Sequence, residues 1–167
     1  MVDKKRMKRH IALTGVDKKQ KQVAKQLADM LEMMVFDCEG YICFNNAMSV
    51  QQLIKKANVT YFKKQVSKSI RELDDLQNMV FVSCDEHLLS VADLQKLNEY
   101  CYVIYLFDSE NAFQYDKNSC VPSLEFFRLC ARAHARYRSR CDFALDINGL
   151  NESQVANKIC EWLQTLV

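Results

Sequence analysis

The feature of this sequence that most constrains its fold is the alternation of short apolar runs with segments of helical periodicity. Between the runs, apolar residues recur every three or four positions, as on the buried face of a helix. Short runs that are apolar at every position are typical of buried parallel strands. The expected strands are 10–14, 34–36, 79–83, 102–107 and 143–145. Strands that alternate with helices predict an α/β fold, a three-layer α/β/α sandwich around a parallel sheet.

The helical segments begin at residues that favour a helix start. Apolar side chains at helical spacing predict a first helix over about 19–34 and a further helix around 62–73. The later helix starts are expected at the capping boxes Ser49-x-x-Gln52 and Ser90-x-x-Asp93, at Pro122 and at Asn151. The helix that follows Pro122 is expected to run to about Tyr137.

Length and apolar content restrict the class of protein. A chain of 167 residues suggests one domain. We assign 10–167 to that domain and 1–9, with its Lys and Arg residues, to a basic N-terminal arm. No apolar run approaches the ~20 residues that a membrane span needs, and no apolar segment follows the basic start as in a signal peptide. A cytoplasmic protein with no membrane contact is therefore expected.

Cysteine and histidine usage gives no reason to expect a metal site. The eight cysteines form no C-x-x-C pair, and the chain has three histidines, whereas structural zinc sites need clustered ligands. We expect the cysteines to be reduced thiols that are mostly buried as small hydrophobic side chains.

The segment between the first strand and the first helix partly matches a phosphate-binding loop. The pattern for such a loop is G-x-x-x-x-G-K-[ST]. Gly15 and Lys21 match it, whereas Gln20 replaces the second glycine and Gln22 replaces the Ser or Thr. The candidate phosphate- or nucleotide-binding residues are Gly15, Lys18, Lys19, Gln20, Lys21 and Gln22.

From about residue 10 to 166 the chain resembles the shikimate kinase family. The segment 36–39 (Phe-Asp-Cys-Glu) resembles the F-x-D-x-D segment that holds the sugar-like substrate and magnesium. Phe62-Lys63 resembles a Phe-Arg pair, and 137–149 resembles the family's closing Tyr, Ala-Asp and Asp-x-x-Gly pattern. The resemblance implies a P-loop kinase-like, five-stranded parallel sheet of order 2-3-1-4-5. It also implies ATP and magnesium as cofactors and a lid, reduced here, around 110–136.

The departures from the family pattern occur at positions that bind phosphate, magnesium or substrate in the family. Gln20 and Gln22 are two of these departures. Where the family has a glycine triplet that binds the substrate ring, this chain has Cys84-Asp85-Glu86, and where the family has the arginine of the Phe-Arg pair, it has Lys63. A substrate-binding arginine four residues before Tyr137 is replaced by Ala133. The substrate-side candidates are Asp37, Glu39, Lys63, Asp85, Glu86, Arg132 and Arg136.

Lys21 and Asp37 are the charged groups of the family's site that persist unaltered, and they are the candidate catalytic residues. Phosphoryl transfer depends almost wholly on positioning and electrostatics, so the missing groups predict a catalytically inactive member that acts by binding. The alternative is a divergent ATP-dependent small-molecule kinase, such as a shikimate kinase or a related phosphotransferase, that binds ATP and magnesium weakly.

Each of two basic clusters allows two interpretations, one with a ligand and one without. Lys18, Lys19 and Lys21 form either an exposed basic loop or a residual anion site. The arginines spaced by four form either a solvated helix face or a contact for a polyanion or an acidic protein; they are Arg128, Arg132, Arg136 and Arg140. Nucleic acid is disfavoured because Tyr137 alone offers a stacking platform there. His134, on the same segment, is expected to be exposed.

Overall fold

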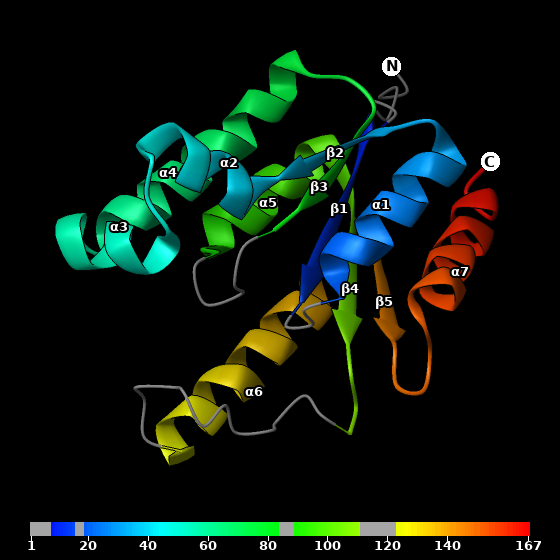
Figure 1. Ribbon diagram of the computed structural model, residues 1–167. Helices are drawn as coiled ribbons and strands as arrows, with labels where there is room; N and C mark the ends of the chain where they lie inside the picture. Colours follow the sequence, from blue (N-terminus) through cyan, green and yellow to red (C-terminus); the bar gives the residue numbers. More distant parts are fainter. Residues whose placement is uncertain (1–7, 16–18, 84–88, 111–122) are drawn as a thin grey trace, which may run out of the picture.

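The computed structural model describes residues 8–15, 19–83, 89–110 and 123–167, with only the backbone for 123–130. Its centre is a five-stranded sheet of order β2-β3-β1-β4-β5, in which every neighbouring pair is parallel. The strands are β1 (His10–Gly15), β2 (Met34–Asp37), β3 (Met79–Val82), β4 (Cys101–Phe107) and β5 (Phe143–Asp146). The parallel sheet predicted from the sequence pattern and the strand order that the family resemblance implies are both confirmed (Figure 1).

Helices cover both faces of this sheet. They are α1 (Gln20–Leu31), α2 (Cys38–Asn46), α3 (Val50–Ala57), α4 (Val59–Glu72), α5 (Val91–Tyr100), α6 (Ser123–Arg140) and α7 (Glu152–Gln164), with a short 3-10 turn, η1 (Leu73–Asp75). Helices α1 and α7 pack on one face, and α4, α5 and α6 lie on the other (Figure 1).

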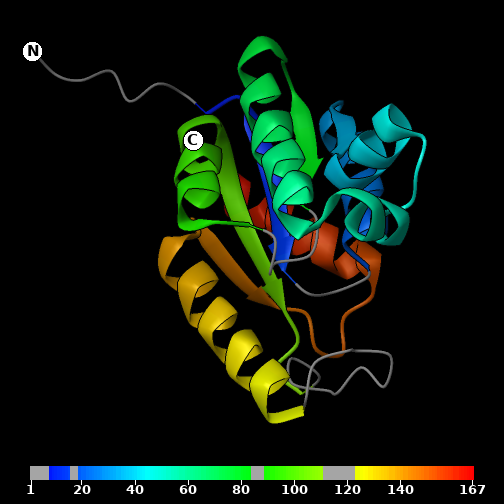
Figure 2. The ribbon, with the colours of Figure 1, turned by 90° about the vertical axis from the view of Figure 1, so that its left-hand side faces the viewer.

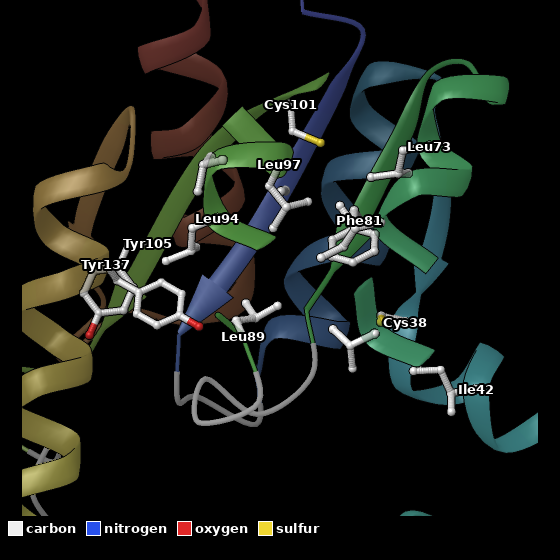
Figure 3. Packing of buried hydrophobic residues seen from close by; sticks show 14 of the residues in the cluster. Cys38, Ile42, Leu73, Phe81, Leu89, Leu94, Leu97, Cys101, Tyr105 and Tyr137 are labelled. Carbon is white, nitrogen blue, oxygen red and sulfur yellow. The ribbon is translucent and has the colours of Figure 1, made fainter. Parts of the chain in front are cut away.

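Alternate side chains of the strands supply the two cores. In β1, Ile11 and Leu13 point into the core beneath α1 and α7, whereas Ala12 joins the core on the other face. The second core contains Phe81 of β3 and Tyr105 of β4, packed against leucines of α5 (Figure 3). Because both faces of the sheet are buried, its central strands are apolar at almost every position.

Two helix ends and one whole helix differ from the expectations. The first helix ends at Leu31 rather than near 34, because Glu32 takes a left-handed conformation (φ 54°) that stops it. Helix α6 continues to Arg140, so 123–136, the later part of the segment assigned to a lid, is helical. Helix α2 was not predicted. Residues 111–122, which include the expected helix start at Pro122, lie outside the described residues.

The predicted helix caps are present. Ser49 with Gln52, and Ser90 with Asp93, form complete capping boxes, and Asn151 caps α7. Each cap gives a hydrogen-bond partner to N–H groups that have none inside the helix.

The end of the basic arm that the structure describes is attached to the domain. The Lys8 ammonium lies 2.7 Å from the Asp142 carboxylate, and the Arg9 N–H donates to the Tyr100 carbonyl at 3.2 Å. Residues 1–7 lie outside the described part of the chain. In the described ranges, no helix is both long and apolar enough to cross a bilayer.

The expectation of mostly buried cysteines is only partly right. Of the described cysteines, Cys38 and Cys101 are buried, whereas Cys43, Cys141 and Cys160 are half-buried. Burial raises the pKa of the Cys101 thiol far above its ordinary value, so this thiol behaves as a hydrophobic core residue.

Candidate functional site

The candidate site lies where the parallel strands end. Gly15 is the last residue of β1, Asp37 is the last residue of β2, and Ser83 follows β3. The carboxyl ends of parallel strands meet at one edge of the sheet, where α/β proteins bind ligands. Residues 16–18 and 84–88, which contain the candidates Lys18, Asp85 and Glu86, lie outside the described residues.

Gly15 serves the fold at this edge. It pairs with Leu106 of β4, and its φ is +134°, a conformation that side chains disfavour. A Cβ added there would lie 2.0 Å from the Leu106 carbonyl oxygen. The backbone of β4 therefore requires glycine at this position, whatever the loop after it binds.

Gln20 turns back onto the start of the loop. Its side chain is buried, with 6% of its surface exposed, and its Nε2 donates to the Gly15 carbonyl. In the phosphate-binding pattern a glycine at this position lets the backbone approach phosphate oxygens. Here that position carries a side chain, and its amide is held by the protein itself.

Lys21 and Asp37 form an ion pair. The Lys21 Nζ lies 3.0 Å from Asp37 Oδ2, and half of the Lys21 side-chain surface is exposed. Partial burial of the ammonium lowers its pKa, but the hydrogen bond and charge of Asp37, with a smaller contribution from Glu39, outweigh burial and leave the Lys21 pKa above its ordinary value. The structure thus brings the two candidate catalytic residues together.

Asp37 is also the N-cap of α2. Its Oδ1 accepts a hydrogen bond from the Gly40 N–H at 3.1 Å, while its Oδ2 faces Lys21. A Cβ on Gly40 would lie 2.9 Å from Asp37 Oδ2, so glycine leaves room for the carboxylate. Both oxygens of the carboxylate therefore have partners within the protein.

The start of α1 has no side-chain cap. Its N-cap is Lys19, in the helical conformation, with no side-chain hydrogen bond to the first turn and no acidic residue in that turn. Gln22 is exposed. The first N–H groups of a helix attract anions, and this helix start lies directly beside Lys21.

The structure places the described substrate-side candidates in separate parts of the site. Lys63 of α4 and Arg136 of α6 line one open groove, and Arg136 Nη1 donates to the Leu89 carbonyl at 3.4 Å. Arg132 is exposed and is not among the residues that line this groove. Asp37 and Glu39 belong to the other side of the site, with Lys21. Ala133 is buried in the core.

The expectation that His134 is exposed is wrong, because its side chain is half-buried. Its Nδ1 lies 2.9 Å from the Tyr105 hydroxyl, and its ring contacts Tyr105 and Phe107. Partial burial and the nearby Arg138 lower the pKa of this imidazole. The available sequence signal was the aromatic residues of β4, because Tyr105 and Phe107 lie on the face of the sheet that α6 covers.

Asp93 was predicted only as part of a helix cap, but its carboxylate also joins two helices. Asp93 Oδ1 accepts from the Ser67 hydroxyl at 2.7 Å, and Oδ2 accepts from the Ser90 N–H and hydroxyl at 2.9 and 2.8 Å. The link to Ser67 ties α4 to α5 and cannot be inferred from spacing along the chain. Among the residues that the structure describes, no group of three or more His, Cys, Asp or Glu could hold a metal ion.

Comparison with solved structures supports the architecture. Shikimate kinase from Acinetobacter baumannii in complex with shikimate superposes with a TM-score of 0.83 and 16% identity, covering 95% of this chain and 94% of that one. Shikimate kinase from Aquifex aeolicus gives 0.83 and 18%, covering 93% and 96%. The enzyme from Bacteroides thetaiotaomicron gives 0.75 and 16%, covering 93% and 98%. At such identities these likenesses show the fold.

The family itself is shown by the sequence profile named Shikimate kinase, which matches residues 20–164. A search of curated proteins finds no significant match. The matched range extends from the first helix, where Lys21 pairs with Asp37, to the last residue of α7. This chain therefore belongs to the shikimate kinase family.

Proposed function

We propose that this member of the shikimate kinase family acts by binding and does not transfer phosphate. The observation that carries the proposal is the ion pair between Lys21 and Asp37 at 3.0 Å. A lysine at this position of the pattern neutralises the β- and γ-phosphates of a nucleotide. Here its charge is already opposed by a carboxylate that is itself fixed as a helix cap.

The groups present do not fit a nucleotide with magnesium. The Gln20 side chain takes the place of the loop glycine and binds the Gly15 carbonyl. Gln22 offers an amide where the pattern supplies a hydroxyl for magnesium. On the substrate side, the Lys63 ammonium lacks the two-pronged geometry with which arginine holds a carboxylate. No step through ATP or magnesium follows from this arrangement.

A coupled assay of ADP release tests the proposal. With ATP, magnesium and shikimate or other small alcohols, we expect the wild-type protein to give the same background rate as the Lys21→Ala variant. Lys21→Ala is a suitable partner because half of the Lys21 side chain is exposed, so the fold should persist. Turnover in the wild type that Lys21→Ala abolishes would overturn the proposal.

The second candidate is a divergent ATP-dependent small-molecule kinase. The start of α1, which has no side-chain cap and has Lys21 beside it, favours this alternative because the first N–H groups of a helix can donate to an anion. Isothermal titration with ATP, with and without magnesium, separates it from the first proposal. Saturable heat that depends on Lys21, together with turnover, would support the kinase. In either case we expect the protein to act in the cytoplasm.

A further inference from the structure

We propose that the open groove along α4 binds an acidic, extended segment of a partner protein. This inference rests on the proposed binding function and names the kind of partner. The α4 groove is lined by Thr60, Lys63, Lys64, Ser67, Arg71, Leu89, Ser90, Asp93 and Arg136. It is formed where α4 and α5 lie side by side with α6 below them (Figure 2).

The charge of the α4 groove is strongly positive. Among the described residues that line it, four are Lys or Arg and only Asp93 is acidic. The two oxygens of the Asp93 carboxylate accept hydrogen bonds from Ser67 of α4 and from Ser90, the N-cap of its own helix α5. Within the described part of the chain, Lys63, Lys64 and Arg71 form no ion pair. Their charges are therefore available to a ligand.

The length of the groove suits a chain rather than a single ring. Its α4 wall runs from Thr60 to Arg71, and the intervening positions Lys63, Lys64 and Ser67 fall on the same helix face. The eleven steps from Thr60 to Arg71 rise ~16 Å along the helix. An extended peptide rises ~3.3 Å per residue, so about five residues would span this wall. Lysine and arginine along it can pair with successive carboxylates.

The lining favours peptide over nucleic acid. Sites for single-stranded nucleic acid combine cations with aromatic rings on which bases stack. None of the described residues that line the α4 groove is aromatic. The groove instead presents the exposed Thr60, whose hydroxyl can hydrogen-bond to a peptide backbone. The hydroxyl protons of Ser67 and Ser90 are donated to Asp93.

Fluorescence anisotropy with a labelled penta-glutamate peptide tests the proposal. The wild-type protein should bind this peptide saturably at low salt, and added NaCl should weaken binding because the charges are exposed. Arg71→Glu and Lys64→Glu should each raise Kd at least tenfold. A penta-glutamine peptide should not bind.

Lys68→Glu is the matched control. Lys68 lies on the same helix and is exposed, but it does not line the α4 groove. The same change of charge there should alter Kd by less than threefold. Because Lys64 and Arg71 are also exposed, thermal melts should show that all three variants fold, and Lys64→Gln provides a milder second variant.

Three results would overturn the groove proposal: no saturable binding of penta-glutamate at low salt, an equal loss in Lys68→Glu, or tighter binding of an oligonucleotide of equal charge. These outcomes are separate from the failure of the proposed function. Turnover in the ADP-release assay would overturn that function, whereas peptide binding without turnover supports both.

Discussion

The Lys21 ammonium and the Asp37 carboxylate lie 3.0 Å apart and join the first turn of α1 to the first turn of α2. Each of these residues matches the family pattern when it is considered alone. Together they neutralise one another, so two apparently preserved groups form a structural contact. Function at this edge of the sheet depends on whether that contact can open.

We predict that Asp37→Asn increases the affinity of the α1 start for polyphosphate. The change removes the negative charge that opposes Lys21, and the Lys21 pKa should fall because Asp37 contributes most to raising it while burial lowers it. Asparagine can still cap α2 through its side-chain oxygen. Isothermal titration with tripolyphosphate should show a severalfold lower Kd than in the wild type.

The control for this change is Asp37→Asn combined with Lys21→Ala, in which the gain should vanish. An unchanged Kd in Asp37→Asn alone would mean that the ion pair does not restrain anion binding.

A second prediction concerns restoration of the loop pattern. The double variant Gln20→Gly with Gln22→Ser removes the side chain that binds the Gly15 carbonyl and supplies a hydroxyl. Calorimetry with ATP and magnesium should detect saturable binding that the wild type lacks. Glycine in the first turn of α1 should cost about 1 kcal/mol of unfolding free energy through helix propensity. Loss of the buried Gln20 side chain and its hydrogen bond to the Gly15 carbonyl should cost about 1 kcal/mol more. If the folded double variant gives no heat, other differences, such as Lys63, keep the nucleotide out.

Most helices and strands could be predicted from the sequence because their signals are local and agree with one another, whereas the strand order came from the family resemblance. Apolar runs, helical spacing and the boxes at Ser49 and Ser90 each act within a few residues. Helix α2 was missed because it lacks such signals. Only Cys38 and Ile42 of α2 are buried, and its cap is Asp37, whose match to the family's acidic segment predicted ligand binding. In the structure, Asp37, the residue that matches the family's acidic segment, is also the residue that caps α2.

The site could be predicted only as a set of candidates. Sequence spacing placed Gly15, Lys21 and Asp37 at the strand ends, but it could not show that Lys21 reaches Asp37 or that Gln20 folds back. Such contacts depend on rotamers and on distances between segments far apart in the chain. The α4 groove is a similar case, because Arg136 joins Lys63 only when α6 packs beside α5.

A third prediction compares two glycines with positive φ. Gly15→Ala should lower the free energy of unfolding by about 3 kcal/mol or more, because the added Cβ meets the Leu106 carbonyl and the backbone is strained. Gly149→Ala should cost only about 1 kcal/mol, since its φ is +71° and no atom lies within 4 Å of the added Cβ. Urea unfolding measures both. Equal losses would contradict the role assigned to Gly15 beside Leu106 of β4.

A fourth prediction concerns His10, which is buried at the start of β1. Its Nδ1 accepts from the Met79 N–H at 3.2 Å, and its Nε2–H donates to the Leu73 carbonyl at 3.0 Å. The neutral ring satisfies both partners, whereas a protonated ring would direct an N–H at the Met79 N–H. Burial lowers the pKa of His10 below its ordinary value of 6.5, and the nearby Arg9 adds to the shift although the Leu73 carbonyl opposes it.

The sign of the pH dependence follows from this shift. As the pH falls through about 6.5, the unfolded chain binds a proton at His10 before the folded chain does, so stability decreases until the pH passes the folded-state pKa. The contribution of neutral His10 is complete above that window. Urea unfolding between about pH 7.5 and pH 5.5 should show this loss. His10→Gln should be less stable at the upper pH and should show a shallower decrease. His134→Asn should alter the slope less, because His134 is only partly buried, and a slope unaffected by His10→Gln would assign the pH dependence to other groups.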